Sequence, residues 1–411
     1  MSPDAASAGV LDDPAAPVLE TKAAAPRRIA VVGSYTIVTF RGWLIEDMVA
    51  QGHTVFACAP ELSATDLARL ARAGAVYQRI GLARTGIDPF QDIAHVTRLA
   101  ALFRKLEIEV VLAHTTKAMI VGCLAARLAG VPRILAIVEG LGYAFTEGPE
   151  RKRRLVRAIL APAMKAALAV CDGVFVLNSD DRAYLIGLGI LSPKQKVVQI
   201  AGTGLDLDHY AYVPPTPGPP RFLLIARLIR DKGIVEYVEA ARIVKAKHPE
   251  ARFRLLGSID EHPGAITRAQ IAAWEAEGVV EYLGVTDDVR PYLADCTCYV
   301  LPSYREGMPR TIMEAMAVGR PVIATDVPGC RDAIEHGVTG WLVPPRDVGA
   351  LAEACMEPIV EPRMIEEFSA GARQAAARRF STAGVNRDII RSLSPVAPAP
   401  AGVVGVALCR P

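Results

Sequence analysis

Two glutamates, Glu306 and Glu314, stand with seven residues between them in the stretch YREGMPRTIMEA, and Gly307, Met308 and Pro309 follow the first of them. Ionised carboxylates accept hydrogen bonds from hydroxyl groups, such as those of a ribose or a sugar ring. The pair therefore indicates a site for a polyhydroxylated ligand. A solvated loop glutamate, followed by a glutamate that is favoured near a helix N-terminus, would give the same two residues.

The elements around the glutamates can be predicted. Residues 296–303, CTCYVLPS, form a short apolar run that predicts a buried strand. Residues 310–319, RTIMEAMAVG, are rich in helix formers and end at a glycine, and Pro309 suits the first helical position. Glu306 then lies in a loop at the carboxyl end of a strand and Glu314 lies early on a helix, where open α/β sheets bind ligands and where helix N-termini attract anions.

The composition describes a globular chain with two domains. A length of 411 residues exceeds a single ordinary core, and 51% hydrophobic with 22% charged residues is typical of globular proteins. The net charge of +2 gives no global electrostatic case for nucleic acid. Eight cysteines without a C-x-x-C pair favour a reduced, cytoplasmic compartment. The Ala/Pro-rich residues 1–26 indicate a disordered leader, not a signal peptide, and no stretch is apolar enough to span a bilayer.

Strand-like and helix-like segments alternate along two halves of the chain. The strands are continuous apolar runs, such as RRIAVVG and VVLAH, which are typical of parallel sheets buried on both faces. We predict α/β domains at residues 27–205 and 221–380, a Pro-rich linker at 206–220, a terminal helix at 381–393 and a flexible tail at 394–411. A cleft between two such domains is a common place for a ligand.

Several other enzyme classes leave no trace in the sequence. Neither half has a G-x-G-x-x-G fingerprint after its first strand, so a nicotinamide cofactor is weakly supported. The sequence contains no Walker motif, no H-E-x-x-H and no G-x-S-x-G.

Three stretches of the second half carry a family resemblance. In chain order they are IARLIRDKGIVEYVEAARIV, YLGVTDDVRPYLADCTCYVLPS and YREGMPRTIMEAMAVGRPVIATDVPGCRDAIEHGVTGWLVPPRD. Together they resemble the retaining glycosyltransferases of family 4. The resemblance implies the GT-B fold, in which two Rossmann-like, doubly wound parallel-sheet domains face a central cleft.

The resemblance assigns roles to four charged residues. Arg227 and Lys232 match the basic pair that holds the donor diphosphate, Glu314 matches the glutamate that binds the ribose, and Glu306 matches the one that faces the donor sugar. Fixed cations can stabilise the charge that develops on a departing nucleoside diphosphate without a metal. A solvated charge pair at a helix start is the alternative for Arg227 and Lys232.

Backbone and hydroxyl groups of the same loop complete the implied donor site. The N–H groups of Gly307 and Met308 match those that cradle the sugar and the diphosphate. Thr311 is a candidate phosphate contact, with an ordinary first-turn threonine as the alternative.

The first half resembles the family more loosely. GSYTIVTFRGWLIEDMVAQGHTVFACAP looks like its opening loop and first helix, which places Arg41 and Gly42 near the diphosphate. LAHTTKAMIVGCLAARLAGVPRILAIVEGLGYAFTEG looks like the branch that builds bacterial surface polysaccharides and polyprenyl-linked oligosaccharides, nearest to N-acetylgalactosaminyltransferase-like enzymes. Within it, His114 and Lys117 could touch donor or acceptor, although a histidine at a strand end is more often structural.

One position departs from the family pattern. Many members have a histidine before the glycine that follows the next strand, and here Glu139 precedes Gly140. Glu139 is a candidate hydrogen-bond acceptor for a hydroxyl or N-acetyl group. Asn178 and Arg182, in VLNSDDRAYL, are weaker candidates.

A basic segment opens a predicted helix in the first half. Its cations are Arg151, Lys152, Arg153, Arg154 and Arg157, and the rest of the helix is apolar. This placement opposes the helix dipole, so it does not serve helix stability. We expect the helix to dock on anionic lipid at the inner face of the cytoplasmic membrane, with a solvated face as the alternative.

The function that the resemblance implies is a retaining, metal-independent transferase. It moves a hexose or N-acetylhexosamine from a UDP-sugar to a lipid-linked saccharide, and it needs no cofactor besides this nucleotide-sugar donor. An epimerase or hydrolase on the same fold and a non-catalytic sugar-nucleotide sensor or scaffold are the alternatives. The ordered set of four charged residues speaks against both.

Overall fold

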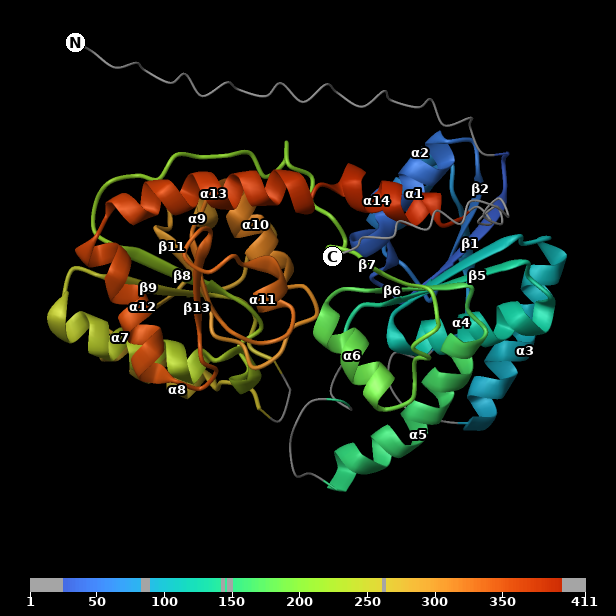
Figure 1. Ribbon diagram of the computed structural model, residues 1–411, viewed down its shortest axis with the longest axis horizontal. Coiled ribbons are helices and arrows are strands. Elements are labelled where there is room, and N and C mark those ends of the chain that lie inside the picture. The colour runs from blue at the N-terminus through green and yellow to red at the C-terminus, as the bar shows by residue number, and fades with distance from the viewer. Residues whose placement is uncertain (1–24, 83–88, 142–144, 146–150, 261–263, 394–411) are drawn as a thin grey trace, which may run out of the picture.

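The computed structural model describes residues 25–82, 89–141, 145, 151–260 and 264–393 of the chain. The expected leader up to residue 24 and the expected tail 394–411 lie outside the described residues. Within them the chain forms two parallel α/β domains that lie side by side (Figure 1). In the part that is described, no helix combines the length and the apolar character that crossing a membrane requires.

The N-terminal domain is built on a parallel sheet with strand order β3-β2-β1-β4-β5-β6-β7. Its strands are β1 (Arg28–Val32), β2 (Thr54–Ala59), β3 (Val76–Arg79), β4 (Val110–His114), β5 (Arg133–Val138), β6 (Gly173–Val176) and β7 (Val197–Gln199). The helices that alternate with them are α1 (Ile37–Ala50), α2 (Ala64–Ala73), α3 (Pro89–Lys105), α4 (Thr116–Ala129), α5 (Arg151–Ala169) and α6 (Ser179–Gly187).

The C-terminal domain repeats the plan with strand order β10-β9-β8-β11-β12-β13. The strands are β8 (Arg221–Ile225), β9 (Arg252–Leu256), β10 (Glu281–Tyr282), β11 (Cys298–Leu301), β12 (Val322–Thr325) and β13 (Gly340–Val343). The helical elements are η2 (Arg230–Lys232), α7 (Ile234–Lys247), α8 (Arg268–Ala276), α9 (Arg290–Asp295), α10 (Arg310–Val318), α11 (Cys330–Ala333), α12 (Val348–Val360) and α13 (Arg363–Arg379), and α14 (Thr382–Arg391) follows.

The central strands are continuous apolar runs because helices cover both faces of each sheet. Every residue of β4 and of β6 is buried, and so is every residue of β11 and β12. A strand that is covered on both sides has no solvated face, so the alternation of polar and apolar residues disappears. The two sheets and their parallel strands confirm the predicted fold class.

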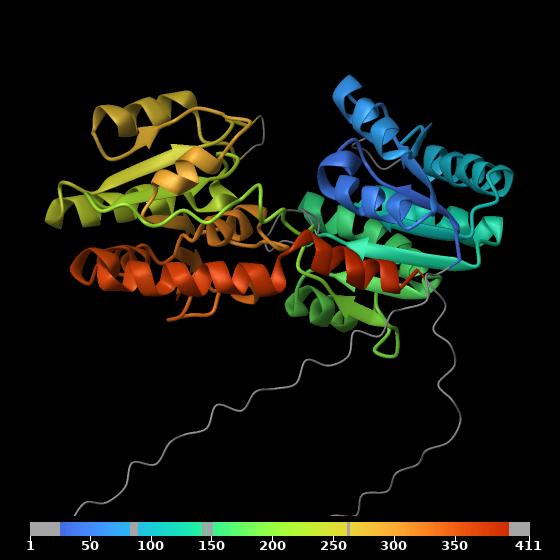
Figure 2. The same cartoon turned by 90° about the horizontal axis from the view of Figure 1, so that it is seen from above.

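The chain crosses between the domains twice, and the crossings lie side by side. The Leu205 N–H donates to the Phe380 carbonyl at 2.7 Å, and the Thr382 N–H donates to the Leu205 carbonyl at 3.0 Å. After the second crossing α14 packs on the N-terminal domain, where Asn386 Nδ2 donates to Asp47 Oδ2 of α1 at 2.6 Å. Figure 2 shows α13 and α14 nearly in line, one over each domain.

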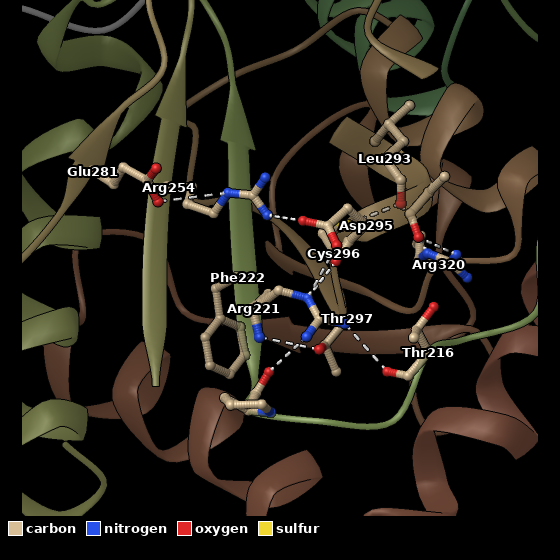
Figure 3. A network of polar contacts seen from close by, with 12 residues as sticks. Thr216, Arg221, Phe222, Arg254, Glu281, Leu293, Asp295, Cys296, Thr297 and Arg320 are labelled. Atoms are coloured by element: carbon tan, nitrogen blue, oxygen red, sulfur yellow. Dashed lines mark hydrogen bonds and ion pairs between the residues drawn. The ribbon is translucent and has the colours of Figure 1, made fainter. Parts of the chain in front are cut away.

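Arg320 joins the linker to the C-terminal domain from a buried position. It is 0% exposed, and its guanidinium donates to four carbonyl oxygens, those of Leu293 (2.8 Å), Ala294 (2.7 Å), Val213 (2.8 Å) and Gly319 (3.2 Å). Figure 3 shows it beside Leu293, next to the network of Arg221, Arg254 and Asp295. Arg320 therefore satisfies carbonyls at the end of α9 and in the linker that would otherwise be buried without partners.

Replacing Arg320 by Met is expected to lower the free energy of unfolding by about 2 kcal/mol, because buried carbonyls lose their donors. Equilibrium urea unfolding of the full chain measures the change. Arg252→Met is the matched control, since Arg252 is an exposed arginine on β9. Equal midpoints for the two variants would contradict the expectation.

Candidate active site between the domains

Glu306 and Lys232 form an ion pair at the carboxyl edge of the second sheet. Lys232 ends η2, Glu306 lies in the loop between β11 and α10, and Nζ is 2.5 Å from Oε1. The side chains are 21% and 12% exposed. The two loops are tied together, because the Tyr304 N–H donates to the Asp231 carbonyl at 2.9 Å. An amine and a carboxylate are thus held where a phosphate and a sugar hydroxyl can compete for them.

The close approach of these loops depends on Gly233. Its φ is +72°, and a Cβ there would lie 2.0 Å from the Pro302 carbonyl oxygen. No side chain fits this space, and L-residues rarely adopt this φ. Gly233 therefore lets Lys232 sit directly against the loop that begins at Pro302.

Arg227 follows β8 at the same edge, but its partner is different. Its Nη1 is 2.9 Å from Asp260 Oδ2, and the Arg227 side chain is 60% exposed. An exposed ion pair of this kind contributes little to stability. The arginine is consequently available to exchange Asp260 for an anionic ligand at small cost.

Glu314 is buried in the second turn of α10 and is held by two donors. Its Oε1 accepts from the Tyr210 hydroxyl and from Arg310 Nε, each at 2.8 Å. Burial and the neighbouring Glu314 carboxylate raise the pKa of Tyr210 to about 12, so this hydroxyl remains a donor. Tyr210 and Arg310 also border a cavity of about 160 Å³ between α1 and the segment 203–210.

The start of α10 differs from the expectation by one residue. Pro309 lies at the N-cap, with φ −70° and ψ 113°, and Arg310 is the first helical residue. The predicted helix end at Gly319 is confirmed, since Gly319 is the C-cap in the left-handed region. In the first turn, Thr311 Oγ1 lies 2.6 Å from the buried Tyr299 hydroxyl, which also lies 3.1 Å from the Ile225 carbonyl oxygen. These contacts fix the position of the threonine hydroxyl beside the end of β8.

Arg41, His114 and Glu139 form one cluster in the N-terminal domain. Arg41 Nη2 is 2.7 Å and His114 Nδ1 is 3.2 Å from the same oxygen, Glu139 Oε1. Arg41 is 1% and His114 is 0% exposed, while the Glu139 side chain is 20% exposed. The structure thus places Arg41 and His114 behind Glu139, and Glu139 is the member that solvent reaches.

Electrostatics keep Glu139 ionised. Burial acts to raise the pKa of its carboxyl, but His114 and Arg41 act in the opposite direction and lower the pKa to about 2. A carboxyl with so low a pKa is a poor proton donor or base at neutral pH, and it is a strong hydrogen-bond acceptor. The arrangement suits recognition of a hydroxyl or amide N–H more than proton transfer.

Glu139→Gln is expected to flatten the acid dependence of stability. The pKa of Glu139 is depressed from 4.5 to about 2 by folding. Its ionised form therefore stabilises the folded state fully above about pH 4.5, and this stabilisation disappears as the pH falls towards about 2. Urea unfolding at about pH 5 and about pH 3.5 measures the difference. The exposed Glu353→Gln is the control; parallel losses in wild type and Glu139→Gln would refute the expectation.

The Glu306 loop meets the Glu139 segment across the domain boundary. A Cβ on Gly307 would lie 2.4 Å from the Glu139 carbonyl oxygen. Met308 is 9% exposed, and a Cβ on Gly202 would lie 3.2 Å from Met308 Cγ. Residues from both domains therefore converge at the loop that carries Glu306.

Two predicted residues lie in other surroundings. A Cβ on Gly42 would lie 2.8 Å from Arg69 Cζ, so the Arg69 guanidinium covers this glycine. Lys117 Nζ is 2.9 Å from Asp92 Oδ1. The contacts of Arg305, Arg310 and Tyr210 with site residues were not predicted. The only local signals are that Arg305 directly precedes Glu306 and that Arg310 lies one helical turn before Glu314.

Comparisons with known proteins agree with this geometry. Residues 219–359 match the family described as "Glycosyl transferases group 1", and residues 36–202 match "Glycosyl transferase 4-like domain". The chain is 28% identical over 330 residues to the N,N'-diacetylbacillosaminyl-diphospho-undecaprenol alpha-1,3-N-acetylgalactosaminyltransferase of Campylobacter jejuni, covering 77% of this chain and 85% of that protein.

A second relative and a solved structure extend the comparison. The UDP-Gal:alpha-D-GlcNAc-diphosphoundecaprenol alpha-1,3-galactosyltransferase of Escherichia coli is 23% identical over 308 residues, covering 72% of this chain and 77% of that protein. The structure of HepE from Anabaena in complex with UDP has a TM-score of 0.70 at 18% identity, and covers 89% of this chain and 99% of that chain. With both of its domains matched in order, the chain belongs to the family 4 glycosyltransferases of the GT-B fold.

Proposed function

We propose that the chain transfers a hexose or N-acetylhexosamine from a UDP-sugar to a lipid-linked saccharide, with retention of the anomeric configuration, during surface polysaccharide or glycan biosynthesis. The observation that carries the proposal is the Lys232–Glu306 pair, with Nζ 2.5 Å from Oε1. The loop that carries Glu306 lies directly against Glu139 of the opposite domain. A donor that lies between the domains would meet a cation for its diphosphate and carboxylates for its sugar.

Each group has a proposed task. Lys232 and Arg227 bind the diphosphate and stabilise the charge on the leaving UDP, while Glu314 binds the ribose hydroxyls. Glu306 orients the donor sugar, and the N–H groups of Gly307 and Met308 and the Thr311 hydroxyl complete the cradle. Arg41 and His114 act through Glu139, which accepts a hydrogen bond from the donor sugar or the acceptor.

The acceptor class follows from the relatives. Both curated relatives named above act, by their names, on sugars joined to diphospho-undecaprenol. Transfer to such a saccharide, and not to water, requires that water be kept from the donor while the domains are closed. A hydrolase would need no saccharide acceptor and would admit water to the donor, and an epimerase would need no saccharide acceptor.

A thermal-shift panel of UDP-, GDP- and ADP-sugars without added metal tests the donor assignment. A ligand that binds the native state raises its melting temperature. We expect UDP and one UDP-sugar to stabilise the wild type and not Arg227→Ala/Lys232→Ala. The stabilising UDP-sugar is then incubated with an undecaprenyl-diphosphate saccharide. Stabilisation without transfer would favour the sensor or scaffold, release of free sugar a hydrolase, and conversion of the UDP-sugar into its isomer an epimerase.

We also propose that α5 docks on the cytoplasmic face of the inner membrane. Arg154 of α5 is exposed, and the exposed fractions of Leu155 and Ile159 beside it are 65% and 45%. Cations next to exposed apolar side chains suit an anionic lipid surface. Co-sedimentation with phosphatidylglycerol vesicles should fall in Leu155→Ser/Ile159→Ser and stay unchanged in the control Val360→Ser, whose side chain is also exposed.

A further inference from the structure

The loop that carries Glu306 is held by the beginning of α6, which belongs to the other domain. Arg305 Nη2, just before Glu306, donates to Asp181 Oδ1. Asn178 Nδ2 donates to the Gly307 carbonyl, just after Glu306, at 2.7 Å. We propose that Asp181 and Asn178 are positioning residues that fix the Glu306 loop across the domain boundary, so that closure of the domains orders the donor-sugar site.

Asn178 and Asp181 are themselves buried and hydrogen-bonded to each other. Asn178 is the N-cap of α6, and its Oδ1 accepts from the Asp181 N–H at 2.7 Å. Its Nδ2 is also 3.0 Å from Asp181 Oδ2. Asn178 is 0% and Asp181 is 1% exposed. The two side chains that define the start of the helix are therefore the same ones that contact the loop, and neither has room to move without disturbing α6.

The Arg305–Asp181 pair is unlike an ordinary surface ion pair. The Asp181 side chain is 2% exposed and that of Arg305 is 22% exposed, and the guanidinium lies 5.5 Å from the Tyr184 ring centroid. Removing one partner of a buried pair leaves an uncompensated charge, which is strongly unfavourable. Burial raises the pKa of Asp181 and Arg305 counteracts it. Arg305, together with the hydrogen bond from Asn178, thus favours the carboxylate form of the buried Asp181.

The neighbouring Asp180 provides an internal comparison. Its Oδ1 is 3.3 Å from Arg331 Nη1, again across the boundary, but the side chains are 33% and 41% exposed. Exposed pairs contribute about 0–1 kcal/mol. Asp180 and Asp181 are adjacent on one helix and both pair with the C-terminal domain, yet only Asp181 contacts the loop of Glu306. The exposed Asp180–Arg331 pair therefore adds little to holding the domains together, whereas the buried Asp181 contact both holds them together and positions the loop of Glu306.

The expected loss of turnover rests on the proposed transfer from a UDP-sugar. The expected separation of the domains does not rest on it. The side chains assigned to UDP are those of Arg227, Lys232 and Glu314, all in the C-terminal domain, and none of them makes the α6 contacts described above. Loss of these contacts should therefore reduce turnover and leave UDP affinity intact. It should also let the two domains separate in solution, whatever the reaction is.

The test compares Asp181→Asn, Arg305→Met and their double variant with the control Asp180→Asn, all in the full chain. We expect kcat to fall about tenfold or more in the first two, since small misplacements of reacting groups are costly, with the Kd of UDP within about twofold of wild type. The double variant should lose no more than either single one, because both remove the same contact. Arg305→Lys, which keeps the charge, should recover part of the rate, and Asn178→Ser, which keeps a capping oxygen, should lower it.

Small-angle X-ray scattering provides a readout that is independent of activity. The radius of gyration without ligand should increase in Asp181→Asn and Arg305→Met and not in Asp180→Asn. Equal kinetic losses in Asp180→Asn and Asp181→Asn, or unchanged kcat and radius in Arg305→Met, would overturn the proposal. If the wild type transfers no sugar, the proposed function fails, and the scattering comparison alone decides whether the α6 contacts hold the domains. Should Asp181→Asn not fold, Arg305→Met removes the same contact from the loop, and its kcat and radius of gyration are compared with those of Asp180→Asn.

Discussion

Lys232→Met is expected to lower kcat by about 100- to 1,000-fold, the usual loss when one group that stabilises developing negative charge is removed. Lys232 Nζ lies 2.5 Å from Glu306 Oε1, so it is already in place before a donor binds. In the proposed reaction the diphosphate of the bound donor pairs with this cation, and UDP needs it most as the bond between the donor sugar and UDP breaks. Methionine keeps an unbranched side chain, one atom shorter than that of lysine, and removes both the charge and the hydrogen-bond donors. Single-turnover transfer from a labelled UDP-sugar measures the effect.

Two further variants make the result specific. Lys247→Met removes a positive charge from the exposed last residue of α7, at the opposite end of this helix from Lys232. It should leave kcat within about twofold, because solvent screens an exposed charge at that distance. Lys232→Arg should retain part of the rate, since it keeps the charge but changes the donor geometry. A kcat in Lys232→Met close to that of Lys247→Met would mean that the diphosphate is bound elsewhere.

The fold was predictable where strands are covered on both faces. The runs that become β1, β4, β5 and β6 are apolar apart from an arginine or histidine at one end, and the alternation of strand and helix predicts a parallel sheet. The edge strands β3 and β7, VYQR and VVQ, were not predicted, because they are short, partly polar and only half buried. An edge strand has a neighbouring strand on one side only, so fewer of its side chains are buried. The hydrophobic pattern that predicts a strand is therefore weaker there.

The candidate site was predictable as far as its residues lie close in sequence. The spacing of Glu306 and Glu314 and the position of Lys232 indicated a common edge, and the structure brings Lys232 to Glu306. The contacts of Arg305 with Asp181 and of Asn178 with Gly307 join residues 124 and 129 positions apart. No local pattern encodes such a pair, because each residue has an ordinary local explanation: Asn178 caps a helix and Asp181 lies in its first turn.

The Arg41–Glu139–His114 cluster was predictable in part: its residues were candidates, but their arrangement was not foreseen. Each residue was a candidate for direct contact with a substrate, and the sequence could not show that Arg41 and His114 are buried behind Glu139. The departure at Glu139 from the family histidine is accompanied by a buried arginine that neutralises it. A carboxylate at this place thus comes with its own counter-ion, which makes it a fixed hydrogen-bond acceptor rather than a replacement for a titrating imidazole.

Gly307→Ala is expected to separate activity from folding. A Cβ on Gly307 would lie 2.4 Å from the Glu139 carbonyl oxygen and 3.4 Å from Leu177 Cδ1, and both of these belong to the other domain. The φ of Gly307 is not positive, so the backbone conformation at this position accommodates alanine. The substitution therefore interferes with the approach of the domains and not with the C-terminal sheet. We expect kcat to fall by about 10- to 100-fold, the scale of a misplacement of about 1 Å.

The accompanying measurements decide what the loss means. UDP affinity should remain within about twofold of wild type, since Glu314 and Lys232 lie on the same domain as Gly307 and keep their contacts. Gly187→Ala is the matched control: it lies at the end of α6, and a Cβ there meets nothing within 4 Å. A fall in melting temperature as large as the fall in activity would assign Gly307 to the fold. Unchanged activity would mean that the contact between Gly307 and Glu139 is not used during turnover, and that the donor sugar is enclosed by other parts of the two domains.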